Sequence, residues 1–222
     1  MLYKSKGLTQ DTYEHILDMI MTKQLLPGDK ISELNISKEL DISRTPVRDA
    51  MRQLANEGII DILPNKFARV ADYSNNRIKD IGLMRIALES MAIRLACQYG
   101  SRADFLRLMQ IAQSCYDSFK KGEFLERRRY DGDFHMELAN ISSNYLLQKF
   151  QKELYLRVQF IQLQYPHPIQ DDENHVKEHF QIVDALMDFD EAKALAITTQ
   201  HLTSFYDLKE SYTDGFFNSL YM

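Results

Sequence analysis

Three histidines and one carboxylate have the types and spacing needed to hold a metal ion. Asp131 and His135 are four residues apart in a segment with helical periodicity, so their side chains share one face. His179 and His201 lie about ten residues before and about eleven after a turn near Phe189. In two antiparallel helices, each would stand roughly 16 Å from that turn. Because imidazole and carboxylate ligands suit Zn²⁺, Ni²⁺, Mn²⁺ or Fe²⁺, the four residues predict a divalent-metal site.

Simpler interpretations compete with this one. A single histidine in a helix is more often a hydrogen-bonded core or surface residue than a ligand, and His175, one turn before His179, could take its place. Arg85 could pair with Glu89 one turn later. It could instead face a cavity and bind a ligand carboxylate through two hydrogen bonds. The residues alone leave these alternatives open.

A second group of residues has the chemistry of DNA recognition. Arg44, Arg48 and Arg52 recur every four residues on one face of a helix for which Ser43 is the predicted N-cap, accepting a backbone hydrogen bond. A neighbouring apolar stripe at helical spacing would be buried. Its members are Val47, Met51 and Leu54. A helix with arginines in its first turns and an apolar back is suited to the major groove.

The elements around this helix predict a winged helix-turn-helix domain over residues 1–72. Two helices come first, over about 8–25 and 31–40, with a turn at Asp41 where left-handed backbone is expected. The arginine helix follows and ends at Gly58, and two β-branched or aromatic runs at 59–63 and 67–70 predict a hairpin.

The rest of the chain predicts an all-α antiparallel bundle, so that the fold is mainly α. Residues 73–77 are polar and predict a linker, and residues 78–222 would form the second domain. Six segments have helical periodicity, near 77–98, 102–121, 124–140, 143–164, 173–187 and 190–211.

Composition limits the classes of function. The net charge of −5 argues against a generally basic nucleic-acid-binding protein, so DNA binding would need the local basic patch at 42–70. No apolar run reaches the roughly 18 residues of a membrane span. Two cysteines and no signal-peptide pattern favour a reducing, cytoplasmic setting.

These motifs together resemble the GntR family of bacterial transcription regulators. The N-terminal resemblance rests on Leu26-Pro27-Gly28-Asp29, Ile42-Ser43-Arg44-Thr45-Pro46-Val47-Arg48-Asp49-Ala50-Met51, Glu57-Gly58-Ile59-Ile60 and Pro64-Asn65-Lys66. The C-terminal part is similar to the FCD ligand-binding domain of the FadR subfamily, in its shorter, VanR-like, six-helix form. That resemblance rests on Arg85-x-x-x-Glu89, Asp131-x-x-Phe134-His135, Asn144, Glu178-His179, Asp190 and His201-Leu202.

The resemblance implies a role for each of three groups of residues. DNA contacts would come from the arginine helix and from the tip of the wing, which would approach the minor groove. These residues are Ser43, Arg44, Thr45, Arg48, Asn65 and Lys66, to which the arginine spacing adds Arg52. The metal ligands would be Asp131, His135, His179 and His201. An effector would contact Arg85 and Asn144.

Two positions depart from the family pattern. Leu34 stands where the family usually has an arginine that contacts the phosphate backbone. Phe67 stands where the wing usually has a glycine, whose freedom to adopt positive φ a phenylalanine lacks.

The sequence therefore predicts a regulator, not an enzyme. It would be a cytoplasmic homodimer that represses transcription, binds a short inverted repeat in double-stranded DNA and responds to a small carboxylate effector beside the metal. One alternative is a constitutive DNA-binding dimer without an effector. Another is a metal-dependent hydrolase. A hydrolase would need a general base beside the metal. The nearby Asp133 is two residues from both Asp131 and His135, so on a helix it would point away from the site.

Overall fold

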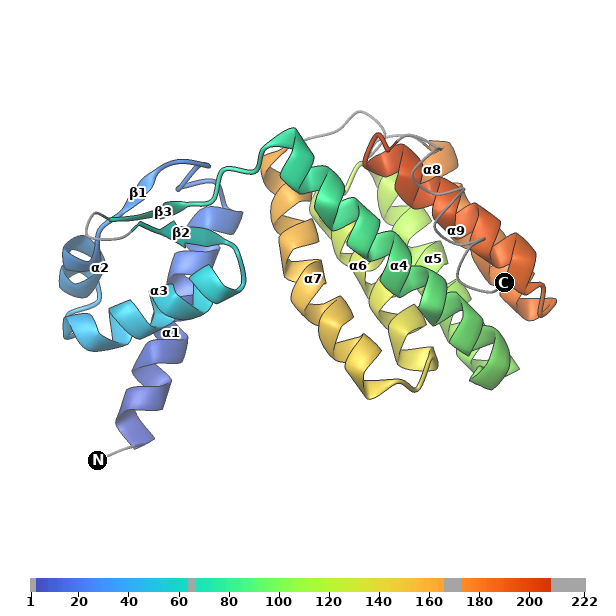
Figure 1. Ribbon diagram of the computed structural model, residues 1–222, viewed down its shortest axis with the longest axis horizontal. Coiled ribbons are helices and arrows are strands. Elements are labelled where there is room, and N and C mark those ends of the chain that lie inside the picture. The colour runs from blue at the N-terminus through green and yellow to red at the C-terminus, as the bar shows by residue number, and fades with distance from the viewer. Residues whose placement is uncertain (1–2, 64–66, 166–172, 209–222) are drawn as a thin grey trace. The chain divides into compact units, whose positions relative to one another are not determined.

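The structure is a computed structural model that describes residues 3–63, 67–165 and 173–208 (Figure 1). Within those ranges it has nine helices and three short strands, which confirms the mainly α fold. The chain divides into two compact units. The first comprises Met1–Ser74 and Phe160–Tyr165, and the second comprises Asn75–Gln159 and Pro166–Met222. None of the described helices is long and apolar enough to cross a membrane.

The first unit is a winged helix-turn-helix. Its helices are α1 (Tyr3–Met21), α2 (Glu33–Glu39) and α3 (Arg44–Asn56). Its antiparallel sheet has the order β1-β3-β2, with strands β1 (Lys30–Ile31), β2 (Ile60–Ile62) and β3 (Ala68–Val70). The sequence predicts that the second helix begins at Ile31, so it does not predict the strand β1. Ile31 instead pairs with Ala68 in the sheet, and the side chain of Ser32 caps α2 by accepting from the Asn35 N–H at 3.3 Å.

The position of α3 is fixed by its apolar back. Val47, Ala50 and Leu54 have no exposed surface, and α3 packs against α1 through this face. Asp41, before the helix, and Gly58, after it, both have positive φ, at 50° and 78°, as predicted for the turn and the C′ position.

The second unit holds the other six helices. They are α4 (Asn75–Tyr99), α5 (Arg102–Lys121), α6 (Phe124–Ile141), α7 (Tyr145–Gln164), α8 (Glu173–Met187) and α9 (Glu191–Phe205). Their core includes Ile93, Phe105, Phe134, Leu138 and Leu186, each fully buried. The last helix ends at Phe205, before the predicted residue 211, and the residues from 209 onward are not described.

Two features differ from the predicted domain boundaries. The α4 helix begins at Asn75, inside the predicted linker 73–77. The end of α7 belongs to the first unit, because the Tyr165 hydroxyl accepts from the Tyr73 N–H at 2.7 Å and donates to Asp72 at 2.9 Å. Periodicity could not reveal this, since the contacts join residues more than 90 positions apart.

Candidate DNA-reading helix and buried metal-ligand cluster

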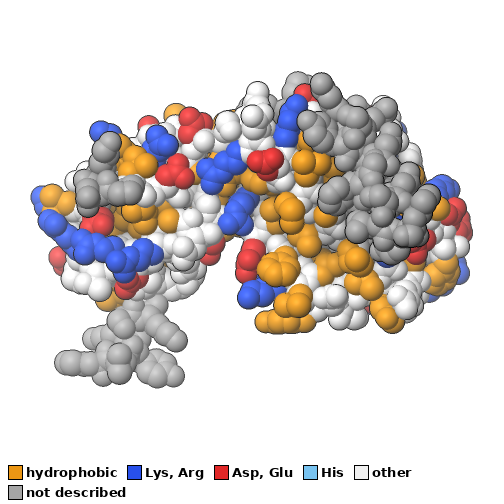
Figure 2. Space-filling model, in the orientation of Figure 1, with side chains coloured by type: hydrophobic (Ala, Val, Ile, Leu, Met, Phe, Trp, Pro, Cys, Tyr) orange, Lys and Arg blue, Asp and Glu red, His pale blue; other side chains and the backbone are white. Residues whose placement is uncertain are grey.

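The α3 helix exposes the predicted DNA-contacting side chains on one face. Ser43, Arg44, Thr45, Arg48 and Arg52 are all exposed, and Figure 2 shows a row of Lys and Arg side chains along α3. Ser43 occupies the predicted N-cap position but makes no side-chain capping hydrogen bond. Its hydroxyl is therefore not occupied by the helix end and can be offered to a ligand.

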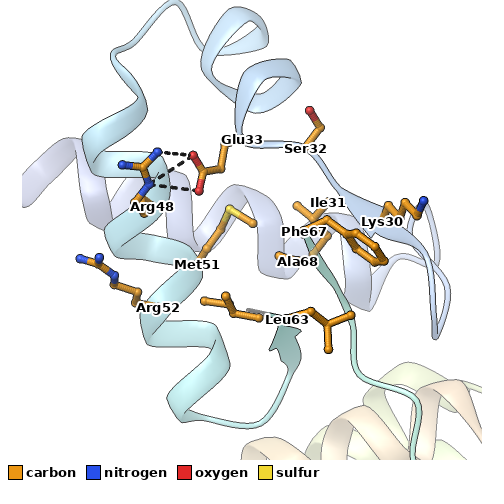
Figure 3. A pocket seen from close by; sticks show the side chains of 11 residues that line it. Lys30, Ile31, Ser32, Glu33, Arg48, Met51, Arg52, Leu63, Phe67 and Ala68 are labelled. Atoms are coloured by element: carbon orange, nitrogen blue, oxygen red, sulfur yellow. Dashed lines mark hydrogen bonds and ion pairs between the residues drawn. The ribbon is translucent and has the colours of Figure 1, made fainter. Parts of the chain in front are cut away.

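Arg48 is held by a carboxylate that sequence reasoning missed. Its Nε donates to Glu33 Oε1 at 3.1 Å and to Oε2 at 3.2 Å, and its Nη2 donates to Oε2 at 2.7 Å (Figure 3). These hydrogen bonds raise the pKa of Arg48 and lower the pKa of Glu33. The partnership has no sequence signal of its own, because the two residues are 15 positions apart on different helices.

A hollow of about 540 Å³ lies between α3 and the sheet, with Arg48 and Arg52 on one side and Lys30 and Phe67 on the other (Figure 3). The Lys30 ammonium lies 4.5 Å from the centre of the Phe67 ring. Lys30 thus adds a cation to the lining of the hollow, and its sequence context gave no signal for this role. Phe67 is not among the described residues with positive φ, so it fits the wing without the conformation a glycine would permit.

Three further positions of this unit bear on DNA contact. Leu34 is 41 % exposed, so an apolar side chain faces solvent where the resemblance implies an arginine. Asn65 and Lys66, the predicted wing-tip contacts, lie outside the described residues.

The second unit brings the four predicted metal ligands together. Asp131 and His135 come from α6, His179 from α8 and His201 from α9, and one donor atom of each lies within 4.8 Å of the others. All four side chains are buried. His179 Nε2 is 3.6 Å and His135 Nε2 is 3.9 Å from Asp131 Oδ1.

Two carboxylates contact the Nδ1 side of two of these histidines and so fix the orientation of the rings. The Nδ1 of His135 lies 2.7 Å from Glu89, and the Nδ1 of His201 lies 2.8 Å from Glu178. With a proton on each Nδ1, each Nε2 keeps its lone pair, which is the form that binds a metal. His135 Nε2 is buried without a hydrogen-bond partner in the described structure.

The residues present fit a divalent cation. Both ring nitrogens of His179 are buried without a hydrogen-bond partner among the described groups, a costly arrangement that a metal would relieve. Burial lowers the pKa of His179 to about 3 and that of His201 well below its usual range, so both rings are neutral, as metal ligands must be.

The competing ligand, His175, stands at the edge of this cluster. Its ring stacks on that of His201 at a centroid distance of 3.8 Å, and its Nδ1 lies 3.3 Å from Glu178. His175, Glu178 and His201 form a second group with ligand spacing, whereas His179 and not His175 lies with Asp131, His135 and His201 in the first.

Arg85 takes the first of its two predicted interpretations. Its Nε donates to Glu89 at 2.6 Å, and both residues are buried. Burial raises the pKa of Glu89, but the charges of Arg85 and His135, together with their hydrogen bonds to the carboxylate, outweigh burial and lower that pKa to about 2. One guanidinium nitrogen, Nη2, is still buried with no partner among the described groups.

Asn144 does not lie in the buried cluster. It is exposed at the start of α7, where its side-chain oxygen accepts from the Leu147 N–H at 3.1 Å. This N-cap role accounts for the residue without an effector.

Sequence reasoning also missed Arg127, on the buried face of α6 one turn before Asp131. It is only 3 % exposed, and its Nε is buried without a hydrogen-bond partner among the described groups. A buried guanidinium with an unpartnered donor is costly, so this side chain is a candidate site for an anionic ligand.

A winged helix with an exposed arginine face, joined to a helical domain with a buried cluster of histidines and an aspartate, is typical of DNA-binding regulators. The family comparisons agree. Residues 8–70 match the model of the bacterial regulatory proteins of the gntR family, and residues 80–204 match the FCD domain. The chain therefore belongs to the GntR family and carries an FCD domain; it is a DNA-binding transcription regulator, not an enzyme.

Relatives and solved structures support the assignment. The chain is 30 % identical over 193 residues to the Nta operon transcriptional regulator of Aminobacter aminovorans, covering 85 % of this chain and 88 % of that one. It is 24 % identical over 201 residues to the transcriptional repressor RspR of Escherichia coli, covering 90 % and 88 %. The structure of Escherichia coli McbR/YncC has the same fold, with a TM-score of 0.72, 19 % identity and coverage of 90 % and 95 %.

Proposed function

We propose that this protein is a homodimeric transcriptional repressor whose FCD domain binds a divalent metal and a small organic acid. The observation that carries the proposal is the buried cluster of Asp131, His135, His179 and His201, with unpartnered nitrogens on two of its histidines. Zn²⁺, Ni²⁺, Mn²⁺ and Fe²⁺ all accept such a donor set. When bound, the metal would supply open coordination positions for a carboxylate or hydroxyl group.

The effector would be an anion because two buried arginines of the same unit each keep a donor without a hydrogen-bond partner among the described groups. Arg85 contributes a buried Nη2 without a partner among the described groups, although Glu89 already balances its charge. Arg127 contributes a buried Nε without such a partner. A carboxylate ligand would satisfy both donors.

Effector control requires that the ligand favour one arrangement of the dimer over another. Two α3 helices related by a two-fold axis would read a short inverted repeat in double-stranded DNA. Repression would follow from occupancy of that site in the bacterial cytoplasm.

An exposed apolar surface supports the dimer. Several large hydrophobic side chains of the second unit have at least 42 % of their surface exposed, among them Met84 and Met91 on α4, and Tyr145, Leu146 and Phe150 on α7. Figure 2 shows hydrophobic side chains gathered over α7. A second copy of the chain would remove this surface from water.

Elemental analysis of protein purified without chelator tests the metal assignment. Wild-type protein should carry close to one divalent metal per chain, and His179→Ala combined with His201→Ala should carry almost none. His15→Ala is the matched control, since His15 pairs with Glu39 in the first unit. His175→Ala resolves the competing ligand set, because metal loss in that variant alone would move the site to the second group.

Gel-shift titration at fixed salt tests the DNA-reading face. Arg48→Ala should weaken binding to a duplex selected by the wild-type protein by about ten- to hundredfold, the range expected for a lost bidentate contact to guanine. Circular dichroism should show an unchanged fold, because Arg48 is exposed. Undiminished affinity would remove Arg48 from the proposed contacts.

A further inference from the structure

Glu33 and Arg48 form a preorganised pair across the two helices of the helix-turn-helix. Glu33 is the first residue of α2, and Arg48 lies in the second turn of α3. The carboxylate receives three hydrogen bonds between 2.7 and 3.2 Å from Nε and Nη2 of the guanidinium. Among the described residues, Glu33 is the carboxylate that forms an ion pair with Arg48.

The pair uses one edge of the guanidinium and leaves another free. A guanidinium has five N–H donors in a planar fork. Glu33 occupies the edge formed by Nε and Nη2, so Nη1 and the second hydrogen of Nη2 stay available. Figure 3 shows the third nitrogen of Arg48 directed away from Glu33. Two parallel donors on this end edge are what the O6 and N7 of guanine accept.

We infer that Glu33 is a positioning and specificity residue that holds Arg48 ready to read guanine while neutralising its charge toward phosphate. The inference rests on the proposed base contact of Arg48. A paired arginine attracts the phosphate backbone less than a free one, and backbone attraction is the part of the affinity that carries no sequence information. The ion pair therefore favours the correct site over other DNA.

A second arginine of α3 provides an internal comparison. Arg52 meets Asp49 through one contact of 3.4 Å, and both side chains are about half exposed or more. That single contact does not fix the plane of the guanidinium. Arg52 suits a phosphate contact, whereas Arg48 has the constraint that base reading requires.

The experiment uses the full-length protein and duplexes selected from a random pool by the wild-type chain. Affinity is measured for a selected duplex, for versions with each guanine replaced, and for an unrelated duplex, over a range of salt concentrations. The variants are Glu33→Ala, Glu33→Gln, Arg48→Ala and the double variant Glu33→Ala with Arg48→Ala. Glu39→Ala is the matched control, because it removes the same charge from the same helix without a described contact to α3.

Glu33→Ala should bind unrelated DNA as well as or better than wild type, while the affinity ratio of selected to unrelated duplex falls about tenfold. The affinity ratio of Glu33→Gln should fall between those of the wild type and Glu33→Ala, because the amide oxygen can still accept one hydrogen bond. In Glu33→Ala, the slope of the logarithm of the affinity for unrelated DNA against the logarithm of the salt concentration should steepen by up to about one, because Arg48 becomes free to contact a phosphate. In the Arg48→Ala background, the Glu33 substitution should leave the ratio unchanged.

Three outcomes would overturn the inference: an unchanged ratio in Glu33→Ala, the same change in Glu39→Ala, or a Glu33 effect that persists without Arg48. If Arg48→Ala itself leaves guanine discrimination intact, the proposed base contact fails instead. The two failures are therefore distinguishable. Circular dichroism of Glu33→Gln confirms that α2 is still folded.

Discussion

The two units contain the same kind of ion pair in opposite surroundings. In the first unit, Arg48 and Glu33 pair on an exposed face, where both side chains keep a third or more of their surface in water. In the second unit, Arg85 and Glu89 pair in the core, with 3 % and 0 % of the side chains exposed. Water screens the first pair, so the pair adds little to stability, whereas loss of either partner of the second pair would leave an uncompensated buried charge.

This difference in burial determines what each ion pair can contribute. The exposed pair leaves one edge of the Arg48 guanidinium open to water, so this edge can bind and release DNA while Glu33 stays in place. The buried pair also contacts His135 and Gln151, through Glu89 at 2.7 and 3.3 Å. A disturbance there would reach the proposed metal ligands directly.

The largest expected effect comes from breaking the buried pair. Glu89→Ala should lower the free energy of unfolding by about 3–5 kcal/mol, because it leaves the Arg85 charge buried and unpaired. Urea unfolding measures the loss. The matched control is Glu191→Ala, whose partner Arg94 lies 2.9 Å away at a partly exposed site, and which should lose less than about 1 kcal/mol. Equal losses in the two variants would contradict the contrast between buried and exposed pairs.

A smaller effect of opposite sign is expected at Arg127. Arg127→Met should raise the free energy of unfolding by about 1–2 kcal/mol without ligand, since it replaces a buried guanidinium that has an unpartnered donor with an apolar chain of similar length. It should also abolish stabilisation by added di- or tricarboxylates in a thermal-shift assay. Arg102→Met, at an exposed site, controls for loss of charge alone. A less stable Arg127→Met protein would mean that the charge is compensated within the chain.

The smallest expected effect is on the stability of the exposed pair. Glu33→Gln should change the free energy of unfolding by at most about 0.5 kcal/mol, as is usual for exposed substitutions. Thermal unfolding followed by circular dichroism checks this. A loss comparable to that of Glu89→Ala would show that the Glu33–Arg48 pair supports the fold, and would remove the distinction between the two regions.

Several elements could be predicted because their signals are local. The apolar stripe of α3, the positive φ of Gly58 and the periodicity of the six bundle helices all depend on residues within a few turns of one another. The meeting of His179 with His201 was also accessible, since a short turn joins their helices and fixes their relative height.

One error arose where a distant partner decides the outcome. Ile31 has a helix-compatible neighbourhood but joins a strand because Ala68 lies beside it. Spacing along the chain alone does not reveal that pairing.

The sequence by itself determined which residues carry the chemistry: the arginines of α3, and the three histidines and one aspartate of the second unit. Residue type and helical spacing are sufficient for that. Only the tertiary structure decided the state of these groups. It placed Glu33 on Arg48 and Glu89 on Arg85, and it left the Nε of Arg127 buried without a hydrogen-bond partner among the described groups. The physical reason is that the charge and hydrogen-bonding state of a side chain depend on which distant groups and how much water surround it.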